Sequence, residues 1–350
     1  STFEGEIYRQ LDGLITDNWD LIKSSHKNVS KNSAGYDLGD VKLADGSFDL
    51  TPLMVGSQGT LGIVSEIDIA IVPNNMSRSL VVAGFAKIDE ADSVVQDILK
   101  LGPATIEMVN SHLLEFIEKH YPNQLKGLLE APFPEILLLI EFDDLGKAIQ
   151  SKKVKKLSKI LDRVTNDYQV TTDYDERDEL WKIRHSAAAV IAHTEGTKKA
   201  LPIIEDGVVP ADKFKEFIHS IYALFKKYNL ESAVWGHAGN ANLHMQPFLD
   251  LATTSDRQKV FKIMDEYYAM VMKLGGSTAG EHNDGRLRAP YLPELYGPEI
   301  YKLFEATKKI FDPHSILTPG VKIGVTKEDQ LRELRQEYNM DHLGQHLPRT

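Results

Sequence analysis

The repeated alternation of strand-like and helix-like segments after residue 79 constrains the fold of this chain most strongly. Short apolar runs predict strands at residues 80–85, 135–142, 201–209, 231–235 and 243–248. Apolar residues at helical spacing predict helices at residues 91–101, 148–164, 211–228 and 256–274. Such units with short returns are typical of antiparallel or mixed sheets with helices packed on one face. The sequence therefore predicts an α+β fold.

The first 75 residues follow a different pattern. A polar, turn-rich stretch leads to the glycine-rich segment 56–62, and an alternating apolar run at 63–72 then predicts a strand that ends at Pro73. The glycine-rich segment precedes a strand and contains no lysine, so it matches neither the dinucleotide-binding fingerprint nor a P-loop. Its three glycines fit a plain tight turn or a close approach of the backbone to a ligand, and the sequence leaves both open.

Composition limits the functional classes. The 350 residues exceed the size at which one hydrophobic core usually stops growing, so more than one domain is expected. A net charge of −11 argues against nucleic acid or an anionic membrane surface as the main partner. Without cysteine the chain forms no disulfide, thiolate nucleophile or iron–sulfur cluster. Neither a transmembrane run of ~20 apolar residues nor a signal peptide is found, which favours a cytoplasmic location, free or peripheral to the membrane.

Two short histidine-containing segments carry the clearest chemistry. Residues 235–244 place His237 and His244 on either side of a stretch of Gly, Ala and Asn that can turn tightly, so both imidazoles could reach one ion. Glu281 could add an oxygen ligand, which leaves its neighbour His282 as a candidate general base. The spacing of the two histidines is a weak signal by itself, because a buried histidine is more often a satisfied core residue.

Seven segments, in this order, resemble the motifs of one flavoprotein family. They are KNSAGYDL (31–38), GSQGTLGI (56–63), WKIR (181–184), EDGVVP (205–210), GHAGNANLH (236–244), GEH (280–282) and FDPHSILTPG (311–320). The family is the FAD-linked oxidases of the vanillyl-alcohol-oxidase type, in the group of D-lactate dehydrogenase, the glycolate oxidase flavin subunit and D-2-hydroxyglutarate dehydrogenase. The resemblance covers the C-terminal portion of that family. It implies a ferredoxin-like cap domain plus part of a flavin-binding α+β domain.

The resemblance also implies a reaction, the oxidation of a D-2-hydroxy acid such as D-lactate, glycolate or D-2-hydroxyglutarate to the 2-keto acid by hydride transfer to FAD. Backbone atoms would approach the FAD at Gly56, Ser57, Gly59, Thr60, Gly62, Ile63, Pro319 and Gly320. Arg184 would clamp the substrate carboxylate, and Asn242 and Gln246 would make polar contacts with the substrate.

The resemblance assigns the histidine segments as well. His237, His244 and Glu281 would bind zinc or another divalent ion, which would hold the hydroxyl and carboxylate oxygens of the substrate. His282 would take the hydroxyl proton as hydride leaves the α-carbon.

The chain departs from the family pattern at three places near this chemistry. Ala241 ends a Gly-Asn-Ala run where the family usually has Gly-Asp-Gly between the two histidines. Asn283 stands at a usual Gly, and Thr318 stands at a usual Asn before Pro-Gly. These changes leave the ligands and the base intact but alter the side chains around them.

The family's first FAD-binding subdomain has no counterpart before residue 27, and the chain begins with Ser rather than Met. We therefore expect a portion of a longer flavoprotein that does not hold FAD stoichiometrically by itself. Residues 1–75 would belong to the FAD-binding domain, 76–275 to the substrate cap and 276–324 to a segment returning to the flavin, with 325–350 as a peripheral tail. The expected partners are the missing subdomain, a 2-hydroxy acid and an unidentified electron acceptor, and a homodimer is left open. The alternatives are an oxidase that uses oxygen and a non-catalytic module that binds a carboxylate or a metal.

Overall fold

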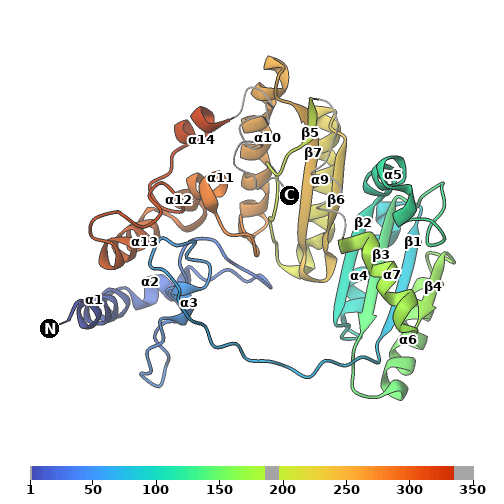
Figure 1. Cartoon of the computed structure of the whole chain (residues 1–350), viewed down its shortest axis with the longest axis horizontal. Coiled ribbons are helices and arrows are strands. Elements are labelled where there is room, and N and C mark those ends of the chain that lie inside the picture. Colours follow the sequence, from blue (N-terminus) through green and yellow to red (C-terminus); the bar gives the residue numbers. More distant parts are fainter. Residues whose placement is uncertain (1, 186–196, 335–350) are drawn as a thin grey trace, which may run out of the picture.

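Seven strands form one antiparallel sheet in residues 2–185 and 197–334, which are the residues that the computed structural model describes (Figure 1). In chain order the strands are β1 (Ser79–Phe85), β2 (Thr105–Asn110), β3 (Ile136–Phe142), β4 (Tyr168–Thr171), β5 (Lys198–Ala200), β6 (Ser232–His237) and β7 (Asn242–Asp250). Their order across the sheet is β4-β1-β3-β2-β6-β7-β5, and every neighbouring pair is antiparallel. The predicted α+β class is confirmed.

Helices pack on both faces of this sheet. The larger core lies under α4 (Ile88–Leu99), α6 (Lys147–Leu161), α9 (Phe214–Tyr228) and α10 (Thr254–Lys273). The opposite face carries a smaller core under α5 (Ser111–His120) and α7 (Tyr174–His185). Val81 and Ala83 of β1 belong to the larger core, whereas Leu80 and Val82, which alternate with them, belong to the smaller one. The sequence predicted helices on one face only. The structure also has a second, smaller layer of helices on the opposite face.

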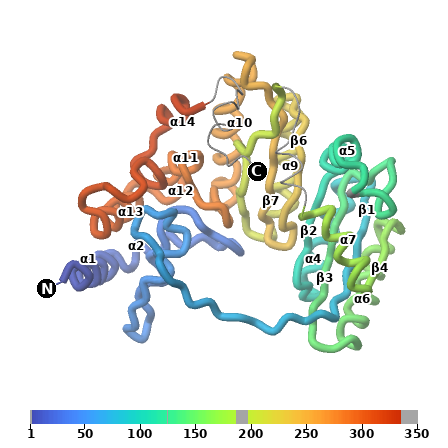
Figure 2. Tube along the Cα trace, viewed as in Figure 1, coloured from blue at the N-terminus to red at the C-terminus, as the bar shows by residue number. Residues whose placement is uncertain are grey.

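The N-terminal helices and the helices of residues 285–333 pack together beside the sheet (Figure 2). The helices involved are α1 (Phe3–Asp17), α2 (Trp19–Ser24), α3 (Thr51–Met54), α11 (Gly285–Arg288), α12 (Leu292–Tyr296), α13 (Pro298–Phe311) and α14 (Lys327–Glu333). Short 3-10 turns lie at Pro122–Gln124, Ala211–Lys213, Ala238–Asn240 and Ala289–Tyr291. Leu11 and Ile15 of α1 share a core with Ile300 and Phe304 of α13. Residues far apart in the sequence therefore build one helical layer.

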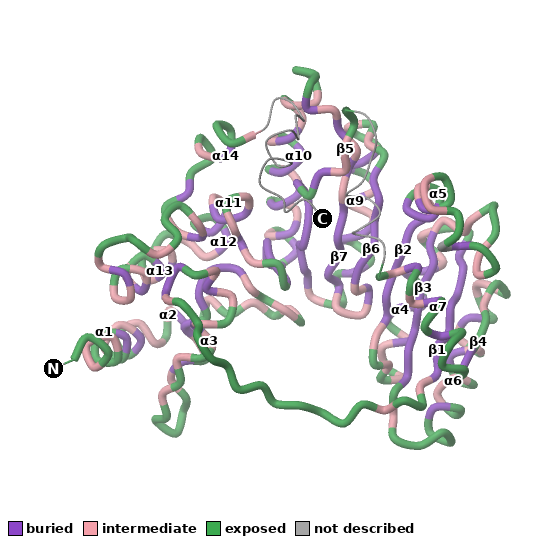
Figure 3. Tube along the Cα trace, viewed as in Figure 1, coloured by how far each residue is buried: buried purple, intermediate pink, exposed green. Residues whose placement is uncertain are grey.

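Residues 62–78 run between this layer and the sheet as an extended segment that is mostly exposed (Figure 3). The predicted strand at 63–72 is therefore wrong. Ile63 and Ile71 expose 88% and 92% of their surface. A strand is stabilised by backbone pairing and by burial of one face, and no strand of the described residues pairs with this segment.

The predicted strand at 201–209 is also wrong. Only isolated bridges at Val208 remain, because the chain turns at Asp206, which has a left-handed φ of 67°. The other predicted strands and helices are present with shifted ends. Within the expected peripheral tail, the described residues contain α14, and residues 335–350 lie outside the described ones. None of the helices that the structure describes is both long and apolar enough to cross a membrane.

Candidate active site

The β6–β7 hairpin fixes the positions of the two predicted ligand histidines. His237 ends β6, and His244 lies on β7 directly opposite Trp235. Alternate residues of a strand share a face, so these side chains lie on the same side of the sheet as α7. Gly236 allows the two strands to approach closely, because a Cβ there would lie 2.8 Å from the Asn242 carbonyl oxygen. Both imidazoles are therefore held by strands rather than by a loop.

Glu281 joins the two imidazoles from a distant part of the sequence. Its Oε1 atom lies 2.8 Å from His237 Nε2 and 3.2 Å from His244 Nε2. Its Oε2 atom accepts a hydrogen bond from Lys31 Nζ at 2.6 Å. The hydrogen bond from His244 is the largest of the effects that lower the pKa of Glu281, so this carboxylate is ionised at neutral pH. The predicted ligand atoms of the three residues lie within 4.8 Å of one another.

A second carboxylate, Glu107, contacts the other nitrogen of His237. Its Oε1 atom lies 2.7 Å from His237 Nδ1, and its Oε2 atom accepts a hydrogen bond from Arg184 Nε at 2.7 Å. Burial by itself would raise the pKa of Glu107, but the hydrogen bond from His237 and the charge of Arg184 outweigh burial and lower it. One carboxylate therefore orients both a predicted metal ligand and the predicted substrate clamp.

Glu205 contacts two histidines at once. Its Oε1 atom lies 2.7 Å from the Nδ1 atoms of both His244 and His282, and the two imidazole rings stack at 4.7 Å between centroids. Burial would raise the pKa of Glu205, but the hydrogen bonds from the two histidines lower it to about 2. Burial would lower the pKa of His244, but its hydrogen bonds to Glu205 and Glu281 raise it to about 9.

Asp206 positions the backbone of Glu281 and His282. Its Oδ2 atom accepts the backbone N–H groups of these two residues at 3.1 Å and 2.8 Å. Asn242 is completely buried and donates to Asp206 Oδ1 at 3.2 Å. The sequence predicted that Asn242 contacts the substrate, but the structure places it behind this loop, where it supports Asp206 instead.

A cavity of about 420 Å³ opens in front of these groups. It is lined by Arg184, Pro202, Glu205, Trp235, His237, His244, Gln246, Glu281, His282, Leu287 and Arg288. All the residues predicted for the metal ion, the base and the substrate share this cavity, apart from Asn242. Trp235 and Leu287 give it apolar walls between the charged groups.

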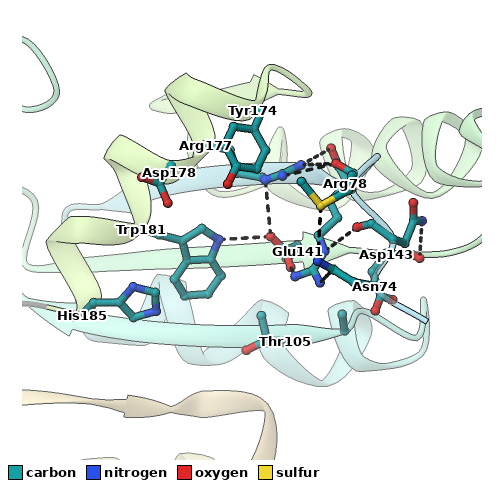
Figure 4. Close-up of a pocket in the computed structure, with 13 residues that line it drawn as sticks. Asn74, Arg78, Thr105, Glu141, Asp143, Tyr174, Arg177, Asp178, Trp181 and His185 are labelled. Atoms are coloured by element: carbon teal, nitrogen blue, oxygen red, sulfur yellow. Dashed lines mark hydrogen bonds and ion pairs between the residues drawn. The ribbon is translucent and has the colours of Figure 1, made fainter. Parts of the chain in front are cut away.

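A second cavity, of about 530 Å³, lies beside α7 and shows how this helix is fixed to the sheet (Figure 4). Trp181 Nε1 donates to Glu141 Oε2 at 3.0 Å, and Arg78 Nη1 donates to the other oxygen of this carboxylate at 2.9 Å. Arg177, also on α7, donates to the Met76 carbonyl oxygen at 3.3 Å. Arg184 follows Trp181 by about one helical turn. These contacts hold α7 against the sheet and therefore fix the position of the Arg184 backbone.

The predicted FAD-lining segments meet beside the histidines. Thr318 Oγ1 donates to the Gly59 carbonyl oxygen at 3.0 Å. A Cβ at Gly56 would lie 2.5 Å from the end of the Asn283 side chain, and Gly56 has a positive φ of 76°, so glycine is favoured where this segment packs against the loop that carries Glu281. The structure thus brings the glycine-rich segment next to the histidine segment, although more than 200 residues separate them in the chain.

At several positions in these segments the side chain is buried, so only the backbone could contact a cofactor. The side chains of Ser57 and Thr60 are buried, and Thr60 Oγ1 lies 2.6 Å from the Tyr36 hydroxyl. Around Gly62 and Gly320 an added Cβ would meet nothing within 4 Å, so the backbone there borders open space. Pro319 and Ile63 are exposed.

The three departures from the family pattern share an unusual backbone conformation. Ala241, Asn283 and Thr318 have φ values of 51°, 61° and 41°, in the left-handed region that glycine and asparagine adopt most readily. At position 283 the asparagine compensates for the absent glycine, because its amide nitrogen can donate to the carbonyl oxygens of Gly56 at 2.8 Å and Ser33 at 3.2 Å. The backbone turns are thus present without the residues that the family usually has there.

Several charged residues at this site had no role predicted from the sequence. They are Lys31, Glu107, Glu205, Asp206 and Arg288. Three of them, Lys31, Glu205 and Asp206, lie inside the segments that resemble the family motifs, and this position could have identified them. Glu107 is far from those motifs in the sequence, and Arg288 lies six residues after the segment 280–282 but outside it, so no local pattern marks either residue.

The sheet, its two helix layers and the histidine–carboxylate cavity together form an α+β fold with a charged cavity. The chain belongs to the family described as FAD linked oxidases, C-terminal domain, which matches residues 74–321. The predicted family is confirmed.

Three relatives share this sequence over most of its length. The glycolate oxidase subunit GlcD of Bacillus subtilis (strain 168) is 31% identical, over 88% of this chain and 61% of its own length. The D-2-hydroxyglutarate dehydrogenase of Pantoea ananatis (strain AJ13355) is 29% identical, over 91% of this chain and 32% of its own length. The D-lactate dehydrogenase of Anaerostipes hadrus is 28% identical, over 83% of this chain and 59% of its own length. The chain thus spans less than two thirds of each relative.

A solved structure shows the same fold. The 4-ethylphenol oxidase from Gulosibacter chungangensis matches with a TM-score of 0.52 and 13% identity, over 72% of this chain and 54% of that chain. At this identity the likeness concerns the fold alone.

Proposed function

We propose that this chain is part of an enzyme that oxidises a D-2-hydroxy acid to the 2-keto acid and transfers the hydride to FAD. The observation that carries the proposal is the meeting of His237, His244 and Glu281 in one cavity with His282 and Arg184. The relatives named for glycolate, D-2-hydroxyglutarate and D-lactate support this class of substrate.

The donor atoms fit zinc or a similar divalent ion. Two imidazole nitrogens and one carboxylate oxygen are ligands that zinc accepts, and three protein ligands leave a position open for a substrate. His237 and His244 each have a carboxylate on the remaining ring nitrogen, which is the usual environment of a metal-binding histidine. A bound ion would polarise the substrate hydroxyl and lower its pKa.

The other residues of the cavity act on the substrate directly. Arg184 binds its carboxylate through the guanidinium group, and Gln246 adds a polar contact. His282 receives the hydroxyl proton at the ring nitrogen that does not contact Glu205. FAD, when bound, accepts the hydride from the α-carbon.

The flavin itself would lie against residues 56–63 and 319–320. Support comes from the open space beside Gly62 and Gly320 and from the family match. We assign residues 1–75 and 276–324 to the flavin-binding part, because α1 and α13 share one core, and residues 76–275 to the cap. A peripheral role for 325–350, a cytoplasmic location, a homodimer and the identity of the electron acceptor stay predictions.

The longer flavoprotein that contains this chain, loaded with FAD (the FAD-loaded protein), is mixed anaerobically with a panel of D-2-hydroxy acids to test the proposal. We expect at least one of them to reduce the flavin, and oxygen consumption would then separate an oxidase from a dehydrogenase. If hydroxy acids bind but none reduces the flavin, the chain is a non-catalytic binding module and the proposal is wrong.

A further inference from the structure

One of the two arginines that line the histidine cavity is already occupied by the protein. Arg288 Nη1 donates to Glu205 Oε2 at 2.9 Å. Its Nε and Nη2 atoms donate to the carbonyl oxygens of Asn283 and His282, at 2.7 Å and 3.3 Å. Arg288 exposes only 7% of its surface. This guanidinium group therefore neutralises a buried carboxylate and supports the loop at 282–283, instead of facing a substrate.

Two further cations at the cavity each have one carboxylate partner. Lys31 Nζ lies 2.6 Å from Glu281 Oε2, and Arg184 Nε lies 2.7 Å from Glu107 Oε2. Arg184 uses only its Nε atom for this contact, and its two Nη atoms have no partner among residues 2–185 and 197–334. The sequence directly after it, at 186–196, contains no lysine or arginine. The described part of the cavity thus offers a cation to one substrate carboxylate but not to a second.

The rest of the cavity wall is uncharged. Apart from the histidines and the charged side chains, the lining consists of Pro202, Trp235, Gln246 and Leu287. Gln246 follows His244 by two residues on β7, so the two side chains lie on the same face of the sheet, roughly 7 Å apart along the strand. The far end of a hydroxy acid that is held beside His244 can therefore reach Gln246.

We propose that the substrate of this site carries a single carboxylate and an uncharged side chain, which lies toward Gln246. A second carboxylate at the far end of the substrate would lose its hydration without gaining a cation, and Glu205 and Glu281 would repel it. An acid such as D-lactate fits this description, whereas D-2-hydroxyglutarate does not. The inference rests on the proposed function, which places the first carboxylate at Arg184.

Two pairs of acids with equal chain length test this inference in the FAD-loaded protein. One pair is D-2-hydroxybutyrate and D-malate, and the other is D-2-hydroxyvalerate and D-2-hydroxyglutarate. Anaerobic flavin reduction at limiting acid concentration gives a second-order rate constant for each acid. Calorimetry gives the affinity for the corresponding 2-keto acids and needs no turnover. We expect the acid with one carboxylate to be favoured about 10-fold or more in each pair by both measurements.

Gln246→Arg should shift this preference, because it adds a guanidinium group for the far carboxylate. The ratio of D-2-hydroxyglutarate to D-2-hydroxyvalerate, in rate constant and in keto-acid affinity, should rise about 10-fold or more. Gln246→Met is the matched control, because its side chain has a similar length but no charge, and it should keep the wild-type ratio.

Two outcomes would overturn the inference. An equal or greater preference for the dicarboxylates in the wild-type protein would do so, even if neither variant folds. An unchanged ratio in a folded Gln246→Arg would overturn the placement of the substrate side chain beside Gln246.

The outcome is separable from the proposed function. If none of the acids reduces the flavin but the keto acids with one carboxylate bind more tightly, the preference stands and the proposed reaction fails. If D-2-hydroxyglutarate reduces the flavin faster than D-2-hydroxyvalerate, the proposed reaction stands and the inference is wrong.

Discussion

Each of the two histidines on the β6–β7 hairpin lies between two carboxylates. His237 contacts Glu107 and Glu281, and His244 contacts Glu205 and Glu281. A positive charge between such carboxylates is stabilised, whether it is a protonated imidazole or a metal ion. Protons and metal ions should therefore compete for the same nitrogens, so metal binding should weaken as pH falls.

The first prediction concerns metal content. The variant with both His237→Ala and His244→Ala should lose its bound zinc, because two of three ligands are removed. Elemental analysis after incubation with zinc and gel filtration measures this. His314→Ala, which changes an exposed histidine, is the control and should keep its zinc. Equal zinc contents in the double variant and the wild-type protein would contradict the ligand assignment.

The second prediction concerns pH and stability of the metal-free protein. Folding raises the pKa of His244 from about 6.5 to about 9, so the folded state holds a proton in this range that the unfolded state releases. The stabilisation is complete below about pH 6.5 and is lost as pH rises through about 9. The free energy of unfolding should therefore fall on the order of 3 kcal/mol across this window. Chemical denaturation at several pH values measures this, and a slope that is the same in His244→Gln would refute it.

The third prediction concerns the substrate clamp. In the FAD-loaded enzyme, Arg184→Lys should raise KM about 10-fold or more, because a planar guanidinium pairs with a carboxylate through two parallel hydrogen bonds and an ammonium does not. Steady-state kinetics with the best hydroxy acid measures KM and kcat. Arg163→Lys, an exposed change at the end of α6, is the control. An unchanged KM in Arg184→Lys would remove this residue from substrate binding.

Elements that carry their own periodicity were predictable from the sequence, and elements that depend on a distant partner were not. α9 and α10 each show a continuous apolar stripe, and both were predicted. Residues 63–72 alternate as a strand does, but a strand also needs a neighbour, and none is present among the described residues. α1 could have been predicted in the same way, because Ile7, Leu11, Leu14 and Ile15 lie at helical spacing in the sequence.

A fourth prediction follows from the exposed segment. Ile69 exposes 73% of its surface in an unpaired, strand-like stretch, which is a typical site of edge-to-edge association. Ile69→Lys should reduce self-association in sedimentation or light-scattering measurements without lowering the midpoint of thermal unfolding. Asp68→Asn changes the charge in the same direction without removing an apolar side chain, and should not reduce association. A clear loss of stability in Ile69→Lys would show that this side chain is buried in solution.

The candidate site combines segments from three parts of the chain. The sheet supplies His237 and His244, the loop before α11 supplies Glu281 and His282, and the N-terminal layer supplies Lys31. The histidine motifs could be predicted because their residues lie close together in the sequence. Glu107 could not, because its position depends on how β2 meets the hairpin, whereas Glu205 and Asp206 lie in a segment that resembles the family motifs.

The fifth prediction tests the packing of the N-terminal segment against α13 in the helical layer beside the sheet. A Cβ at Gly35 would lie 2.4 Å from the Phe304 ring, so Gly35→Ala should lower the free energy of unfolding by about 1–3 kcal/mol and loosen the layer. Gly46→Ala is the matched control, because Gly46 also has a positive φ but nothing lies within 4 Å of its added Cβ. Equal effects of the two substitutions would mean that backbone strain, and not the packing of Phe304, determines stability.

The most direct test of the account is the rate of anaerobic flavin reduction by a saturating D-2-hydroxy acid, compared between the FAD-loaded wild-type protein and His282→Asn. We predict rapid reduction in the wild-type protein and a rate lower by about 10²-fold or more in the variant, because a general base has been removed from the cavity. Equal rates in the two proteins would contradict the assignment of His282 as the base and, with it, the proposed mechanism.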